Sequence, residues 1–285
     1  MNRKQIILSS LYLGFTPLFK NATIMQNTNE TITVRLIRNA TVTIQYKNQL
    51  LLIDPLFSRK SSLDPIPWTN EVRNPTVDLP FGENELKKLV ESTTVVLVTH
   101  LHPDHWDTEA QKRLPKNSFL ICQEEDKEKL AAQGFTNLYA DQSVLAGDGI
   151  KITRVPARHG RGEIAERMAP VSGYIIQFPK KTIYLTGDTV WYEDVEKVIS
   201  DFHPDLVIAN GGAAQFQFGE PITMGADDVL NVARSIDAGA KVMVVHMEAI
   251  NHCYLTRAAL KGKLSEAGLS DKCIILSDGE SVSLI

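Results

Sequence analysis

The chain has 285 residues, and 43% of them are hydrophobic, which is enough to bury the core of one large α/β domain. Its formal net charge of -4 gives no basic excess, so we expect no nucleic-acid partner. Its three cysteines are scattered and form no C-x-x-C pair, which excludes a disulfide framework and a cysteine-based zinc motif.

The N-terminal residues differ in composition from the rest of the chain. Arg3 and Lys4 precede a loosely apolar run over residues 6–19, a pattern typical of a weak secretory signal. Polar residues interrupt the run and no small-x-small cleavage site follows it, which favours the alternative of an N-terminal extension packed on the protein.

These observations divide the chain into that segment, residues 1–30, and a main domain, residues 31–285. If residues 1–20 act as a signal, the protein is exported or periplasmic, which is the alternative we favour; otherwise it is cytoplasmic. No other stretch reaches the ~18 consecutive apolar residues that span a bilayer, so we expect no integral membrane segment.

Short strands are predicted at the start of the main domain. Alternation and β-branched residues over residues 31–38, 41–46 and 50–53 predict an antiparallel meander that ends at Asp54. Four prolines within residues 56–81 rule out a regular element there. Loops of this length in a compact domain are usually functional or disordered.

Strands and helices alternate along the rest of the chain. A mixed sheet with helices outside it, an α/β (α+β) fold, is the architecture that this order favours. The predicted strands are residues 95–98, 150–155, 173–178, 182–185, 206–209 and 242–245, and the predicted helices are residues 84–90, 192–199, 226–236 and 256–264.

A cluster of metal-binding residue types follows the apolar run 95–98. His100, His102, Asp104 and His105 lie within six residues, and imidazole and carboxylate are ligands of zinc and its first-row neighbours. A turn at the end of a buried strand can aim such side chains into one cleft. The alternative is a polar loop whose histidines are structural residues with their hydrogen bonds satisfied in the core.

Three further residues of these types follow predicted strands. His159, Asp188 and His246 each come at or shortly after a strand end, and side chains from neighbouring strand ends converge on one edge of a sheet. The alternatives are two structural histidines and an ordinary turn aspartate after Gly187.

The order of these motifs resembles that of the metallo-β-lactamase-fold hydrolases. The match covers residues 31–285, and the segments 186–192, 210–214 and 246–257 are similar to the branch that includes L-ascorbate-6-phosphate lactonase. The resemblance implies an αββα four-layer sandwich with metal ions at one edge.

The resemblance also implies a ligand set and a reaction. Two divalent ions, zinc first and manganese or iron as alternatives, would support a metal-bound hydroxide that attacks a small ester or lactone. The positive charge of the ions and the arginines near His159 favour an anionic substrate. The implied ligands are His100, His102 and His159 for one ion, Asp104, His105 and His246 for the other, and Asp188 between them; the catalytic residues are Asp104, Asp188 and His252.

Other residues are candidates for substrate binding. Arg158, Arg161 and Arg167 flank His159, and a guanidinium suits phosphate or carboxylate, although a solvated surface paired with nearby glutamates is the alternative. His252 either caps a loop or donates a proton to the leaving group. Asn210, Glu248 and Trp68 complete the set of residues expected near the substrate.

Three other functions stay open at this stage. A phosphodiesterase of the same fold, a di-iron redox protein and a metal-stabilised binding module without turnover use similar ligand sets. We expect a small-molecule substrate as the partner and leave a homo-oligomer open.

Overall fold

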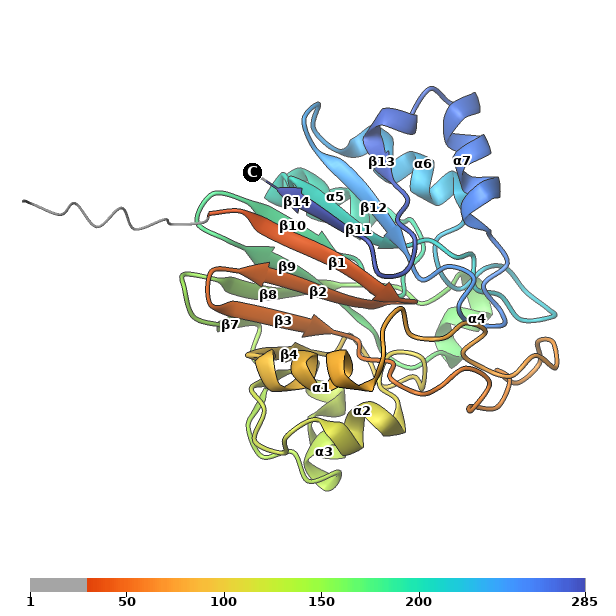
Figure 1. Ribbon diagram of the computed structural model, residues 1–285. Coiled ribbons are helices and arrows are strands. Elements are labelled where there is room, and N and C mark those ends of the chain that lie inside the picture. Colours follow the sequence, from red (N-terminus) through yellow and green to blue (C-terminus); the bar gives the residue numbers. More distant parts are fainter. Residues whose placement is uncertain (1–29, 285) are drawn as a thin grey trace, which may run out of the picture.

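A computed structural model describes residues 30–284 of the chain, so the predicted N-terminal signal or extension lies outside the described residues except for its last position. Two seven-stranded sheets pack face to face, and helices cover both outer faces (Figure 1). This four-layer αββα arrangement confirms the predicted fold class.

The first sheet contains the predicted meander. Its strand order is β14-β1-β2-β3-β4-β5-β6; β14, β1, β2 and β3 are antiparallel neighbours, and β3 to β6 run parallel. The strands are β1 (Ile32–Arg38), β2 (Thr41–Tyr46), β3 (Gln49–Ile53), β4 (Val95–Leu97), β5 (Leu120–Ile121), β6 (Leu138–Tyr139) and β14 (Ser281–Leu284).

The second sheet has the order β13-β12-β11-β10-β9-β8-β7. Strands β7 to β10 are antiparallel neighbours and β10 to β13 run parallel, so β8, β10, β11 and β12 all point in one direction. The strands are β7 (Ser143–Leu145), β8 (Lys151–Pro156), β9 (Ser172–Gln177), β10 (Thr182–Leu185), β11 (Leu206–Asn210), β12 (Lys241–Val245) and β13 (Cys273–Ile274).

Helices form the two outer layers. The predicted helices correspond to α1 (Glu83–Ser92), α5 (Glu193–Phe202), α6 (Ala226–Ser235) and α7 (Arg257–Glu266). The sequence did not predict α2 (Thr108–Arg113), α3 (Glu124–Ala132), α4 (Gly162–Arg167) or the 3-10 helix η1 (Ser270–Lys272). These are short or bury few residues: α3 buries Asp126 and Leu130 only, so its apolar periodicity is weak.

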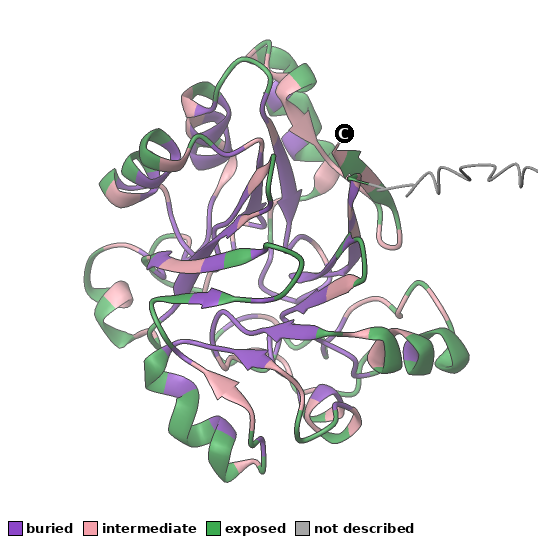
Figure 2. Cartoon of the chain, turned by 90° about the vertical axis from the view of Figure 1, so that its left-hand side faces the viewer, coloured by how far each residue is buried: buried purple, intermediate pink, exposed green. Residues whose placement is uncertain are grey.

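Three of the four apolar clusters within residues 30–284 lie between the layers, and the fourth lies around Leu56 and Ile222 beside the predicted metal-binding residues. The central core lies between the sheets, where Val34 and Ile44 of the first sheet pack with Ile176 and Ile208 of the second. A second core lies under α5, α6 and α7, and a third lies under α1, α2 and α3. Figure 2 shows the buried strands at the centre and the exposed outer faces of the helices around them.

The loop between β3 and α1 has no helix and no regular strand. It carries an isolated bridge between Leu63 and Asn74, in agreement with the prediction that its prolines exclude a regular element. Within residues 30–284, every helix is too short or too polar to cross a lipid bilayer.

Candidate metal centre

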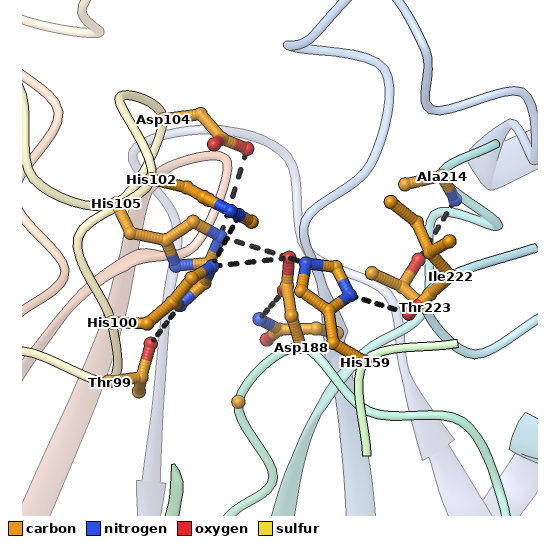
Figure 3. A network of polar contacts seen from close by, with 12 residues as sticks. Thr99, His100, His102, Asp104, His105, His159, Asp188, Ala214, Ile222 and Thr223 are labelled. Carbon is orange, nitrogen blue, oxygen red and sulfur yellow. Dashed lines mark hydrogen bonds and ion pairs between the residues drawn. The ribbon is translucent and has the colours of Figure 1, made fainter. Parts of the chain in front are cut away.

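The structure brings the predicted histidines and aspartates together at one edge of the two sheets. His246 directly follows β12, Asp188 follows β10 by three residues, and His159 follows β8 by three residues. These strands run in one direction, so their carboxyl ends meet at one edge, opposite the turn after β4. In Figure 3, Asp188 lies in the middle: His100, His102 and His105 from that turn lie on one side of it, and His159 lies on the other side.

Distances within the cluster link the seven side chains in three overlapping groups of donor atoms. The Oδ2 atom of Asp188 lies 3.2 Å from His105 Nε2, 3.5 Å from His159 Nε2 and 4.0 Å from His100 Nε2. Three groups have all their donor atoms within 4.8 Å: His100, His102 and His159; His100, His105 and Asp188; and Asp104, His105 and His246.

Two glycines allow the backbone to make this arrangement. Gly187 adopts a φ of +64°, and a Cβ atom there would lie 2.6 Å from the carbonyl oxygen of Ser172. A Cβ atom on Gly212 would fall on the carbonyl oxygen of His246. Only glycine fits both positions, so the turns that carry Asp188 and His246 depend on them.

The outward ring nitrogens of four histidines are hydrogen-bonded, which turns their other nitrogens to the centre. The Nδ1 atom of His100 lies 3.0 Å from Oγ1 of Thr99, and that of His105 lies 2.8 Å from Oδ2 of Asp54. The Nδ1 atom of His159 lies 2.9 Å from the carbonyl oxygen of Ile222, and that of His246 lies 3.3 Å from Sγ of Cys253. Outer contacts of this kind fix the tautomer and orientation of metal-binding histidines.

His159 provides a direct test of whether a cation fits. Its Nδ1 atom must donate to the Ile222 carbonyl, and burial lowers the pKa of the ring to about 4, so Nε2 carries a lone pair. That Nε2 atom is buried and has no hydrogen-bond partner within residues 30–284. An inward lone pair without a partner is the chemistry that a bound cation satisfies.

The charge balance of the cluster points the same way. Burial would raise the pKa of Asp188, but His105 and His246 hold it well below its usual range, so the carboxylate is ionised. Burial lowers the pKa of His100 well below its usual range. Although burial lowers it, Asp188 and Asp104 raise the pKa of His105 to about 10, and Asp188 raises the pKa of His246 well above its usual range. The negative charge of the two aspartates therefore favours positive charge in the cluster. The donors fit a divalent ion bound by imidazole and carboxylate.

The other residues expected near the substrate divide into two groups. Trp68 and His252 line a pocket of about 270 Å³ that opens beside the cluster, together with His102, Asp104, His159 and Asp188. Asn210 does not line it, but its Nδ2 atom donates to Oδ1 of Asp188 at 2.7 Å.

The arginines and Glu248 lie outside the pocket lining. Arg158 pairs with Glu193 at 3.0 Å and Arg161 with Asp228 at 2.7 Å. Arg167 is exposed and also outside the lining, and Glu248 pairs with Arg257 at the start of α7. The partners of Arg158 and Arg161 are therefore acids that lie far from them in the sequence, Glu193 and Asp228, and not the nearby glutamates that the sequence suggested.

The sequence analysis missed two residues that support the site. Asp54 accepts hydrogen bonds from His105 Nδ1 and from the backbone and hydroxyl of Thr99. Asn39 donates from Nδ2 to the carbonyl of Asp104 and accepts from the backbone N–H of His246. Both residues directly follow a predicted strand, 31–38 for Asn39 and 50–53 for Asp54, so each carried the same positional signal as the ligand candidates.

Comparisons with known proteins agree with this geometry. A family model described as "Beta-lactamase superfamily domain" matches residues 50–247. The UPF0173 protein YddR of Bacillus subtilis (strain 168) is 36% identical over 250 residues, which cover 86% of this chain and 97% of that protein.

Two solved structures are similar over most of the chain. An isothiocyanate hydrolase from Delia radicum gut bacteria is 34% identical with a TM-score of 0.81, and the match covers 88% of this chain and 98% of that one. A possible metal-dependent hydrolase from Veillonella parvula DSM 2008 is 31% identical with a TM-score of 0.83, covering 88% and 99%. The chain therefore belongs to the β-lactamase superfamily domain family, within its UPF0173 group of metal-dependent hydrolases.

Proposed function

We propose that the chain is a binuclear metal-dependent hydrolase of a small-molecule substrate. The observation that carries the proposal is the inward, unpartnered Nε2 lone pair of buried His159, at 3.5 Å from the ionised carboxylate of Asp188. The proposed ligands are His100, His102 and His159 for one ion and Asp104, His105 and His246 for the other, with Asp188 shared between them. Zinc is the first candidate, and manganese or iron are the alternatives.

Two divalent ions, when bound, supply Lewis acidity and lower the pKa of a coordinated water molecule to about 7. The protein's own residues orient that chemistry. Asn210 holds Asp188 by donating to Oδ1, and Asp54 holds the ring of His105 through Nδ1. Both contacts are buried, so the donor set is arranged before substrate arrives.

His252 is the proposed proton carrier for the departing group. Its ring lines the pocket, and its buried Nδ1 atom has no partner within the described chain. Burial lowers the pKa of the ring to about 4, so the imidazole is neutral at pH 7 and carries one proton. A neutral imidazole can take a proton at one nitrogen and release one at the other, which suits transfer to a leaving atom.

The pocket supports an uncharged ester or lactone better than an anionic one. Among residues 30–284, no lysine or arginine lines it, and Arg158 and Arg161 are paired with acids elsewhere. Water attack on the carbonyl carbon breaks the C–O bond, and one proton passes to the leaving oxygen. We also propose that the chain is similar in activity to the lactonase branch, because its segments around Asn210 and His246 resemble the motifs of that branch.

A second candidate substrate class is an isothiocyanate. The solved isothiocyanate hydrolase is 34% identical and aligns over 98% of its own length, and the apolar lining here would suit an uncharged R–N=C=S molecule. Water attack on the central carbon would break the C–N bond and give R–NH2 and carbonyl sulfide, with both water protons on nitrogen.

A substrate screen of the metal-loaded protein tests the proposal. The panel contains uncharged and phosphorylated esters, lactones, isothiocyanates and phosphodiesters, each after loading with zinc, manganese or iron. We expect turnover of an uncharged ester, lactone or isothiocyanate, and its loss in Asp188→Ala but not in the exposed control Asp141→Ala. Turnover of phosphodiesters alone would favour the phosphodiesterase alternative, a coloured di-iron protein that consumes oxygen would favour redox chemistry, and binding without turnover would favour the binding module.

A further inference from the structure

Three aromatic side chains from two distant segments meet near the mouth of the pocket. The ring centroid of Trp68 lies 6.3 Å from that of Phe216 and 6.2 Å from that of Phe218, and the two phenylalanines stack at 5.9 Å. Trp68 and Phe216 line the pocket. We call Trp68, Phe216 and Phe218 the aromatic rim.

The pocket lining contains two chemically different groups of side chains. The polar group contains His102, Asp104, His159 and Asp188, whereas Ile66, Met168 and Ile222 belong to the same apolar cluster as Phe216. Trp68 is 68% exposed and Phe218 is 49% exposed, so a group that covers them removes apolar surface from water. A substrate that contacts both groups carries its reacting carbon near the polar side chains and an apolar substituent near the apolar ones.

Trp68 has an unfavourable backbone conformation, which contacts with neighbouring segments must stabilise. Its φ of 59° lies in the left-handed region, which is unfavourable for a bulky residue. Its carbonyl oxygen accepts from the backbone N–H of Gln217 at 2.8 Å, which ties it to the segment that carries Phe216 and Phe218. Among residues 30–284 the indole nitrogen has no hydrogen-bond partner, so the backbone contacts and the two phenylalanine rings decide the position of the indole.

Asn251 holds the residues that follow Trp68. Its Nδ2 atom donates to Oγ1 of Thr69 at 2.7 Å and to the carbonyl of Asn70 at 2.8 Å, while its Oδ1 atom accepts from Nδ2 of Asn74 at 2.9 Å. Asn70 in turn donates to the carbonyl of Asn251 at 2.6 Å. Asn251 is buried and precedes His252, so it joins the proline-rich loop to the turn beside the candidate metal centre.

We propose that the aromatic rim is the subsite for a flat apolar substituent of an uncharged substrate, and that Asn251 is a positioning residue that holds Trp68 over this subsite. The proposal rests on the proposed hydrolase function, because it assumes that the reacting carbon lies at the donor cluster. It adds the substrate class: a molecule with an aromatic or similarly flat apolar group next to the bond that breaks.

A pair of metal-chelating probes tests the subsite without turnover. Acetohydroxamic acid and phenylacetohydroxamic acid share one chelating group and differ by a phenyl ring. Calorimetric Kd values for the zinc-loaded full chain give the preference for the ring as a ratio. We expect the wild type to bind the phenyl probe about tenfold tighter than the methyl probe, the scale of one buried aromatic contact.

Variants separate the rim from general effects. Trp68→Ala removes an exposed side chain and is expected to reduce the Kd ratio to about twofold or less while leaving the Kd of the methyl probe unchanged. Val72→Ala is the matched control, since Val72 is an exposed apolar residue of the same loop, is 52% exposed and does not line the pocket. Its ratio should stay at the wild-type value.

The role of Asn251 is tested in the same assay. Asn251→Asp keeps the size of the side chain and removes the Nδ2 hydrogen bonds to Thr69 and Asn70, so the ratio should fall although Trp68 is present. Thr69→Val removes one of these bonds at nearly equal volume and gives a smaller fall, and it serves if Asn251→Asp does not fold by circular dichroism.

The outcomes distinguish the two levels of the proposal. Equal ratios in the wild type and Trp68→Ala overturn the subsite, and an unchanged ratio in a folded Asn251→Asp or Thr69→Val variant overturns the positioning role. If neither probe binds the zinc-treated wild type, the metal centre fails first, and the subsite that depends on it fails with it.

Discussion

The Nδ1 atom of His105 lies 2.8 Å from the Oδ2 atom of Asp54, and both side chains are buried. Asp54 also accepts from the backbone N–H of Thr99 at 2.8 Å and from its hydroxyl at 2.7 Å. One carboxylate at the end of β3 therefore orients a candidate ligand and the turn that carries His100.

Replacement of Asp54 tests this relationship. Asp54→Asn keeps the shape of the side chain but removes its charge and one acceptor, so His105 loses its fixed tautomer. We expect a 10- to 100-fold loss of zinc affinity, about the effect of outer-sphere partners in other metal sites. A chelator competition titration measures it, with Asp141→Asn as the exposed control; equal affinities in the two variants would argue against the role of Asp54.

Replacement of Gly212 tests whether the turn that carries His246 needs the close approach between the Gly212 backbone and the His246 carbonyl oxygen. A Cβ atom at Gly212 would meet the carbonyl oxygen of His246, so Gly212→Ala must displace one of the two turns. We expect a loss of at least about 2 kcal/mol in the free energy of unfolding. Gly239→Ala is the matched control, since nothing lies within 4 Å of its added Cβ atom. Equal denaturant midpoints for the two variants would contradict the packing described for this turn.

His252 predicts a pH dependence of folding in the chelator-treated protein. Burial lowers its pKa from 6.5 to about 4 in the folded chain, so between these values the unfolded chain binds the extra proton and the folded chain does not. Stability therefore rises with pH across this window and is lost as the pH falls toward 4.

The measurement compares the wild type with His252→Asn, which does not titrate. Between pH 7 and pH 4, the unfolding free energy of the wild type should fall more than that of the variant, by on the order of 3 kcal/mol for a shift of this size. Parallel pH profiles from urea unfolding would show that His252 is protonated in the folded chain at an ordinary pH.

The arginines beside His159 test the charge of the substrate. Because Arg158 and Arg161 are paired with Glu193 and Asp228 outside the pocket lining, Arg158→Ala/Arg161→Ala should leave KM for an uncharged substrate within about twofold of the wild-type value. A phosphorylated analogue of the same substrate should also show no selective loss. A large rise in KM for the phosphorylated analogue alone would restore the anionic substrate expected from the sequence.

Local rules predicted the mixed sheet with helices outside it and the donor residues at strand ends, whereas the αββα sandwich and the grouping of the ligands came from the resemblance to the metallo-β-lactamase-fold hydrolases. His100, Asp188 and His246 come after apolar strands whose periodicity is strong, and strand ends in one direction share one edge. The two-residue strand Leu120–Ile121 and helix α3 (Glu124–Ala132) were missed because short elements with few buried residues leave little periodicity to detect.

Contacts between distant segments could not be predicted in this way. The ion pair between Arg161 and Asp228 joins residues 67 positions apart, and the sequence analysis weighed only nearby glutamates. Likewise, the sequence left Trp68 open as a loop anchor or a substrate wall, because its position depends on Gln217 and Asn251. The N-terminal segment, the oligomeric state and the metal identity stay predictions.

The most direct test of the central claim is the metal content of the purified protein. After loading with zinc and removal of free ions, inductively coupled plasma mass spectrometry should find about two zinc ions per wild-type chain. The Asp188→Ala variant should retain clearly fewer, because Asp188 is proposed to be shared by both sites. A folded wild-type chain that retains no zinc, manganese or iron after loading would contradict the account.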